Sequence, residues 1–95
     1  MEQFMYVAWI RDTRFPPEDQ DSEWVACIVI RAASAADAQE WGDHLAKRKC
    51  SGNDQEVFMW SEVHMRDNPT YSEEMWSSVP EVAYGEEATD KHIGW

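Results

Sequence analysis

The sequence predicts one small α+β domain over residues 1–95, built as a ββαβ sheet with one main helix on one face. Three observations predict this class. Two apolar runs rich in aromatic and β-branched residues come first, a segment with helical spacing follows them, and an alternating segment comes last. Ninety-five residues are enough for one hydrophobic core and too few for two.

The first two predicted strands are the runs Phe4–Ile10 and Trp24–Ala32. Aromatic and β-branched side chains favour strands, and both runs are dense in them. The segment between them is acidic and contains two prolines, so we expect a long acidic loop over residues 12–23. The two strands should then form an antiparallel pair.

A helix is predicted to begin after Ser34, because Ser34 followed by Asp37 resembles a capping box. Basic residues 47–49 suit the negative end of a helix, and Ser51-Gly52-Asn53 supplies a stop. One apolar face recurs at helical spacing and consists of Ala35, Ala38, Trp41 and Leu45.

The segment Glu56–Arg66 alternates and predicts a third strand, joined to the second by a helical crossover. Alternation places Val57, Met59, Ser61, Val63 and Met65 on one side, and Phe58, Trp60, Glu62 and His64 on the other.

Asn68-Pro69 ends this strand, and Thr70 with Glu73 is expected to cap a short second helix that runs to Val79. Residues 80–95 are predicted to form an irregular C-terminal segment. Two alternatives stay open for it: an edge strand around residues 82–84, or a tail pinned by Ile93 and Trp95.

One helix covers only one face of a sheet, so the second face needs another explanation. Its expected members are Met5, Val7, Trp9, Val25, Cys27, Val29, Phe58, Trp60, Glu62 and His64, with Arg11, Arg31 and Arg66 at the rim. Three explanations remain open: a cover by the tail, a second copy of the chain, or a ligand cleft. A tail cover would use Tyr71, Trp76, Tyr84, Ile93 or Trp95.

Charge excludes two classes of partner. The chain carries nineteen acidic and eight basic side chains, a formal net charge of −11, and residues 51–95 hold ten of the acids and only two of the bases. This charge repels phosphate backbones and anionic lipids, so we expect neither direct nucleic-acid binding nor membrane binding. The longest apolar runs have seven residues, far short of the roughly 20 that span a bilayer.

The start of the chain lacks the basic region of a secretory signal, and Cys27 and Cys50 have no disulfide-framework spacing, so we predict a cytoplasmic protein without a disulfide. No metal or cofactor is predicted. Asp19, Asp21 and Glu23 resemble the opening of a calcium loop, but Trp24 and Ile30 stand where that loop needs glycine and glutamate. The zinc-ligand types His44, Cys50, His64 and His92 lack paired spacing, and glycine-rich phosphate loops are absent.

Glu62 and His64 are the weak catalytic candidates, because a carboxylate two residues away on one strand face can orient an imidazole. A His beside a Glu at a sheet rim is far more often part of an ion pair with neighbouring Arg side chains, and this is the alternative explanation.

The leading hypothesis is therefore a small acidic domain that binds a protein partner or a second copy of itself, as in a homodimer. No catalytic activity is assigned to it. Its candidate interface residues are Trp9, Arg11, Arg31, Trp60, Arg66, Trp76 and Trp95. The alternative is a small dimeric α/β-type enzyme or ligand-binding protein that uses the polar rim of the second face. The ββαβ order resembles ferredoxin-like and dimeric α/β sheets, but such folds host many functions and assign none.

Overall fold

The computed structural model describes residues 1–16, 18–19, 22–52, 55–89 and 95, and it confirms the α+β class. The elements follow one another as β1 (Glu2–Asp12), β2 (Glu23–Ala32), α1 (Ala35–Ser51), β3 (Glu56–Met65), α2 (Glu73–Ser78) and β4 (Glu81–Ala83). The first three strands, the main helix and the short helix were each expected from the sequence.

The four strands form one mixed sheet in the order β3-β1-β2-β4. β1 is antiparallel to both β2 and β3, and β4 is parallel to β2. β2 and β3 therefore run parallel with β1 between them, and α1 makes the crossover that joins them. This strand order does not confirm the ferredoxin-like arrangement, because the chain returns after α2 to the far edge of β2.

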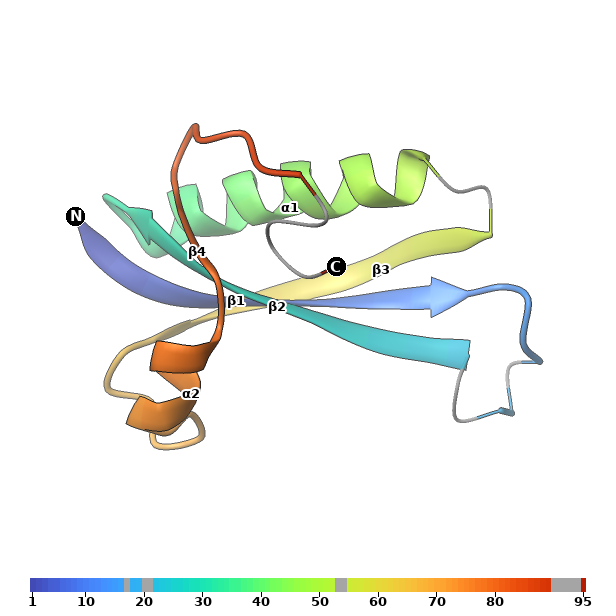
Figure 1. The fold of residues 1–95 in the computed structure, drawn as a ribbon, viewed down its shortest axis with the longest axis horizontal. Helices are drawn as coiled ribbons and strands as arrows, with labels where there is room; N and C mark the ends of the chain where they lie inside the picture. Colours follow the sequence, from blue (N-terminus) through green and yellow to red (C-terminus); the bar gives the residue numbers. More distant parts are fainter. Residues whose placement is uncertain (17, 20–21, 53–54, 90–94) are drawn as a thin grey trace.

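The helix α1 lies along one face of the sheet (Figure 1). Ser34 caps it by accepting a hydrogen bond from the Asp37 N–H, as the sequence predicted, and Gly52 is the C-cap. Its buried residues are Ala38, Gly42, Leu45 and Ala46. Ala35, expected on this face, is exposed because it belongs to the first turn at the end of the sheet.

The C-terminal segment returns along α1, on the same side of the sheet. The Trp41 Nε1–H donates to the Glu86 carbonyl at 3.0 Å, the Tyr84 hydroxyl reaches Glu40 at 3.3 Å, and Trp95 packs against the core between α1 and the sheet. The expectation that Tyr84 or Trp95 covers the second face is therefore wrong, because both rings find apolar partners beside α1. Ile93 lies outside the described residues.

The short helix α2 lies on the other side of the sheet from α1, at the end where β1 begins (Figure 1). Its cap is Ser72, whose hydroxyl accepts from the Met75 N–H, and not Thr70. Thr70 is held instead in a turn by Asn68, whose side-chain oxygen accepts the Thr70 N–H at 2.9 Å. The buried Trp76 packs α2 onto Met5, Val7 and Val29.

A β-bulge interrupts the pairing of β1 with β3. Trp9 pairs with Trp60, but the next residue, Ile10, pairs with Phe58 and skips Met59. One extra residue reverses the alternation beyond it. Phe58 therefore packs into the core beside α1, contrary to the simple alternation, and Val57 takes its place on the second face.

Candidate functional site

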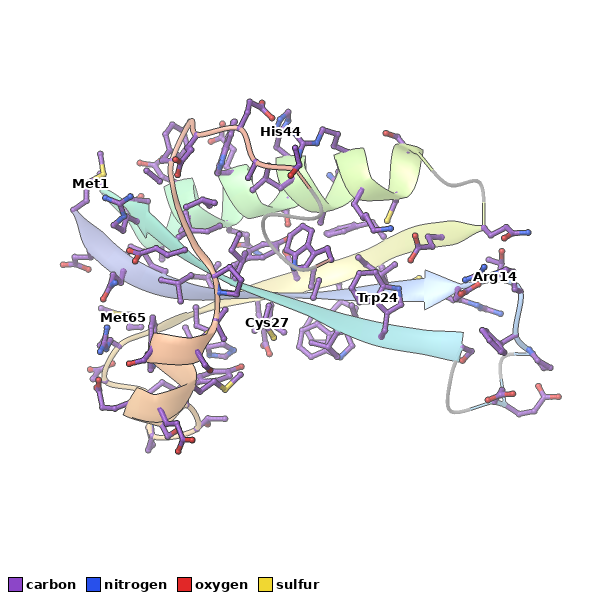
Figure 2. All side chains as sticks on the ribbon, viewed as in Figure 1. Met1, Arg14, Trp24, Cys27, His44 and Met65 are labelled. Carbon is purple, nitrogen blue, oxygen red and sulfur yellow. The ribbon has the colours of Figure 1, made fainter. Side chains whose placement is uncertain are left out.

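The second face of the sheet, opposite α1, consists of side-chain rows that cross β2, β1 and β3. Residues that pair across strands point to the same side, so the registers fix each row. The rows are Glu23, Arg11 and Val57; Val25, Trp9 and Trp60; Cys27, Val7 and Glu62; Val29, Met5 and His64; and Arg31 with Gln3. Figure 2 shows the Cys27 side chain on this side of the sheet and His44 on the outer surface of α1.

α2 covers only part of this face. Trp76, with Tyr71, Met75 and Val79 around it, packs over the rows that contain Met5 and Val7. Among the described residues, the rows nearer the β1–β2 loop carry no such cover: Trp60 is 49% exposed, Val25 48% and Val57 44%. α2 and Tyr71 therefore cover one end of the second face, and the other end remains an exposed apolar surface.

We call this surface the apolar patch and define it as Trp9, Val25, Val57 and Trp60. The Trp9 and Trp60 rings stack with their centroids 3.8 Å apart and an interplanar angle of 4°. Trp9 is half-buried and also touches the cluster under α2, so it holds Trp60 in place. Stacking of this kind fixes the side chains before any partner arrives.

Arg11 lies beside the patch, between Glu23 and Val57 in the register. Its Nε atom is buried and has no hydrogen-bond partner among the residues that the structure describes. A buried guanidinium nitrogen without a partner costs free energy unless a neighbouring group supplies an acceptor. Trp and Arg are the residue types that most often dominate protein interfaces.

The other rim residues are held in ion pairs at the covered end. Arg31 pairs with Glu81 at 2.9 Å, and the Gln3 amide donates to the same carboxylate at 3.0 Å. Arg66 pairs with Glu73, and its guanidinium also lies over the Trp76 ring, 5.0 Å from the centroid. The hydrogen bond from the Arg66 guanidinium lowers the pKa of the Glu73 carboxyl. These groups fasten α2 and β4 to the sheet.

Glu62 and His64 are brought together, as their spacing predicted. The His64 Nε2 lies 3.1 Å from the Glu62 Oε1, and the Asn68 amide donates to the His64 Nδ1 at 3.0 Å. Since the Asn68 oxygen accepts from Thr70, its NH₂ group must face His64, and the neutral ring carries its proton on Nε2. That atom is buried and Tyr71 lies against the ring, so the imidazole is shielded, whereas the Glu62 side chain is 39% exposed.

A partly buried polar network that the sequence did not reveal ties α1 to the sheet. The Tyr6 hydroxyl donates to the Asp43 Oδ1 at 2.7 Å, and the Ser61 hydroxyl donates to the same oxygen at 2.6 Å. Gln39 donates to the Ser61 hydroxyl and carbonyl. Burial and the hydrogen bond to Asp43 raise the pKa of Tyr6 above its usual value of 10.0. Only the register, which places Ser61 beside Ala8, brings these residues together.

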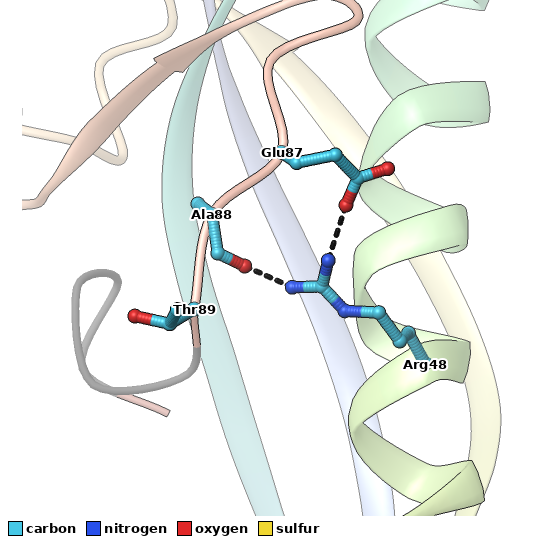
Figure 3. A pocket seen from close by; sticks show the side chains of 4 residues that line it. All are labelled: Arg48, Glu87, Ala88 and Thr89. Carbon is cyan, nitrogen blue, oxygen red and sulfur yellow. Dashed lines mark hydrogen bonds and ion pairs between the residues drawn. The ribbon is translucent and has the colours of Figure 1, made fainter.

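Of the cavities on the described part of the surface, the two best formed are lined by neither Glu62 nor His64. One, of about 370 Å³, lies between α1 and the C-terminal segment, where Arg48 binds both the Glu87 carboxylate and the Ala88 carbonyl (Figure 3). The other, of about 560 Å³, lies at the end of the sheet around Arg31 and Arg66, whose guanidinium groups are already paired with glutamates.

Comparisons with protein-family models, with curated proteins and with solved structures found no match. The site therefore has to be interpreted from its own chemistry.

Among the described residues, no group of three or more His, Cys, Asp or Glu is placed to hold a metal ion. Asp21 and His92, considered above as ligand types, lie outside those residues. Cys27 and Cys50, both described, form no disulfide, and burial raises the pKa of the Cys27 thiol. Of the helices that the structure describes, neither is long and apolar enough to cross a bilayer.

Proposed function

We propose that this chain is a protein-interaction domain that binds its partner through the apolar patch and Arg11. The proposal rests on the row of Val25, Trp9 and Trp60, in which Val25 and Trp60 are about half exposed: α2 leaves this row uncovered although it covers the rows of Val7 and Met5. An exposed cluster of large apolar side chains on a sheet face is typical of a surface that another protein buries.

The shape of the patch favours a protein over a small molecule. It is one end of a sheet face, and the two cavities described above lie elsewhere on the molecule. Small ligands need concave sites that enclose most of their surface. The stacked pair of Trp9 and Trp60 presents a broad, rigid contact area instead, which suits the centre of a protein interface.

The charge of the chain points to a partner with a basic rim. Glu23 and Glu62 lie in the rows that contain or adjoin the patch, and the whole chain carries a net charge of −11. Such a field steers a positively charged protein towards the patch and repels an acidic one. The partner that fits is a protein with an apolar contact surface surrounded by Lys and Arg.

A selection experiment tests this proposal. Ligands are selected from a displayed library of random peptides against the immobilised domain. Calorimetry then measures the affinity of each purified peptide for the wild-type domain, for Trp60→Ala and for a control variant. Trp60→Ala should weaken binding at least about tenfold, because truncating a central tryptophan typically costs 2 kcal/mol or more.

The matched control is Tyr84→Ala, which removes an exposed aromatic ring on the opposite side of the sheet and should leave the affinity unchanged. The selected peptides should combine aromatic residues with Lys or Arg, and their affinity should fall as salt rises. Peptides that bind Trp60→Ala as tightly as the wild-type domain would refute the apolar patch as the binding surface.

A further inference from the structure

We propose that two copies of this chain pair through the free edge of β3, in antiparallel register about a two-fold axis at Val63. This interface is separate from the apolar patch, and the proposal goes beyond the proposed function. The occupant of the edge is a second copy of the same strand.

The edge of β3 is long and poorly protected. β3 has ten residues, lies at the end of the sheet order, and pairs only with β1 in the part of the chain that the structure describes. It contains neither Lys nor Pro, the residues that commonly block exposed edges. Its protection is limited to the bulge at Met59, which leaves the segment from Trp60 to Met65 regular, and to two outward carbonyls that already accept a hydrogen bond: Ser61 from the Gln39 side chain and Met65 from the Asn68 N–H.

The hydrogen-bond pattern identifies which backbone groups face outward. The Val29 N–H donates to the Pro80 carbonyl, and the Arg31 carbonyl accepts from the Tyr84 N–H. The backbone N–H and C=O groups of the odd residues of β2 therefore point towards β4, and those of its even residues point towards β1. The even residues of β1 therefore bond to β2 and its odd residues to β3.

The same alternation then assigns the groups of β3. The β3 residues that oppose odd residues of β1 are Trp60, Glu62 and His64, so their backbone groups bond to β1. The backbone groups of Ser61, Val63 and Met65 therefore point away from the sheet. An independent contact agrees: the Ser61 carbonyl accepts a side-chain hydrogen bond from Gln39, at 3.2 Å. Among the backbone hydrogen bonds that the described residues form outside the helices and strands, none is donated by the N–H group of Ser61, Val63 or Met65.

Charge selects the register among those that the outward groups allow. A two-fold axis at Glu62 would place Glu62 directly opposite its own copy, and like charges in that position are destabilising. An axis at Ser61 would run into the bulge. An axis at Val63 pairs Ser61 with Met65 of the partner copy, uses all three outward residues, and sets Glu62 opposite the partner's His64.

The pairing has a consequence for the assembly. Antiparallel strands are related by an axis perpendicular to the sheet, so both α1 helices would lie on one side of an eight-stranded sheet and both apolar patches on the other. A dimer of this form presents two patches to a partner and gains avidity from them.

Hydrogen exchange tests the pairing on the full chain. Amide exchange is followed by NMR at about 20 μM and about 1 mM protein, with the molecular mass measured by sedimentation. At the higher concentration a dimer should form and the amides of Ser61, Val63 and Met65 should gain at least about tenfold protection, which corresponds to 1.4 kcal/mol. The inward amides of Trp60, Glu62 and His64 should be protected at both concentrations.

A charge swap tests the register. His64→Glu sets carboxylates opposite one another in both symmetric rows and should raise the dimer dissociation constant roughly tenfold, since each cross-strand pair contributes up to about 1 kcal/mol. Adding Glu62→Lys places opposite charges in both rows and should recover the dimer. Circular dichroism of each variant separates loss of pairing from loss of folding.

A chain that stays monomeric up to 1 mM would overturn the proposal, as would a dimer whose protected amides lie elsewhere. A single His64→Glu variant that folds and dimerises like the wild type would overturn the register. None of these outcomes bears on the Trp60→Ala test of the apolar patch, because that test measures a different surface.

Discussion

At the scale of single residues, Tyr6 shows how one polar atom is accommodated in the core. Its ring is fully buried between the sheet and α1, and its hydroxyl has one acceptor, the Asp43 carboxylate. A buried hydroxyl without a partner is costly, and so is a partly buried carboxylate that loses a donor. The hydrogen bond thus fixes α1 on the sheet at one point, and Ser61 supports it from β3.

We expect Tyr6→Phe to lower the free energy of unfolding by about 1–3 kcal/mol, because Asp43 loses a hydrogen-bond donor in a buried setting. Urea unfolding at pH 7 measures the loss. Tyr84→Phe is the control, since the Tyr84 hydroxyl lies at the surface, 3.3 Å from Glu40, and its removal should change stability little. Equal stability of wild type and Tyr6→Phe would show that the network does not contribute.

The same residue gives a pH dependence with a definite sign. The pKa of Tyr6 is raised in the folded chain, first by burial and then by Asp43, whereas the unfolded tyrosine keeps a value near 10.0. The stability that the neutral phenol contributes is therefore complete below pH 10 and is lost as the pH rises towards the folded pKa. The decline of stability above pH 10 should be shallower in Tyr6→Phe, and Tyr71, Tyr84 and Cys27, whose pKa values are also raised in the folded chain, contribute to what remains.

At the scale of secondary structure, the contact between α1 and β1 depends on one glycine. A Cβ atom at Gly42 would lie 2.2–2.5 Å from three atoms of the Tyr6 ring, which has no exposed surface into which it could move. Glycine in a helix ordinarily weakens it by roughly 0.5–1 kcal/mol relative to alanine. Here close packing outweighs helix propensity.

We therefore expect Gly42→Ala to destabilise the domain by about 1–3 kcal/mol, the usual cost of overpacking a core, despite the gain in propensity. Gly52→Ala is the matched control, because its Cβ would meet only the Lys49 carbonyl at 3.7 Å and its φ of −83° suits any residue. Thermal unfolding of the two variants gives the comparison. A Gly42→Ala variant more stable than the wild type would mean that Tyr6 can shift.

Local signals made some elements predictable. Ser34 and Asp37 lie three residues apart and meet in the helix cap, so the start of α1 could be placed from the sequence alone. The bulge at Met59 could not be predicted, because the side-chain pattern of Glu56–Arg66 alternates without interruption. The position of the extra residue is fixed only by the pairing of β3 with β1. The sequence therefore placed Trp60, Glu62 and His64 on the second face correctly and Phe58 wrongly.

The direction of the C-terminal segment also depended on distant contacts. Trp95 is as apolar as Trp76, and nothing near it in the chain specifies a side of the sheet. Its indole N–H donates to the Cys27 carbonyl at 3.3 Å and its ring contacts Tyr6, both far away in sequence. Trp76 was placed correctly among the covers of the second face, where it packs against Met5, Val7 and Val29.

At the scale of the whole molecule, the net charge of −11 means that repulsion among the acidic side chains opposes the stabilisation that the ion pairs provide. Arg31 with Glu81, Arg48 with Glu87 and Arg66 with Glu73 lie at the surface, where such pairs contribute at most about 1 kcal/mol each. The repulsion acts among all the acids in a compact chain whose radius of gyration is 13.3 Å. The Debye length is about 30 Å at 0.01 M salt and about 8 Å at 0.15 M, so salt screens repulsion across the whole molecule.

We expect the melting temperature, measured at about 5 μM protein to limit self-association, to rise by about 4–8 °C between 0.01 M and 0.15 M sodium chloride. That rise corresponds to about 1 kcal/mol for a domain of this size. Glu18→Lys, at an exposed loop position, reduces the net charge to −9 and should show a higher melting temperature at low salt and a smaller rise. Repulsion and ion pairing respond to salt in opposite directions, so a melting temperature that falls with salt would mean that the ion pairs outweigh the acidic excess.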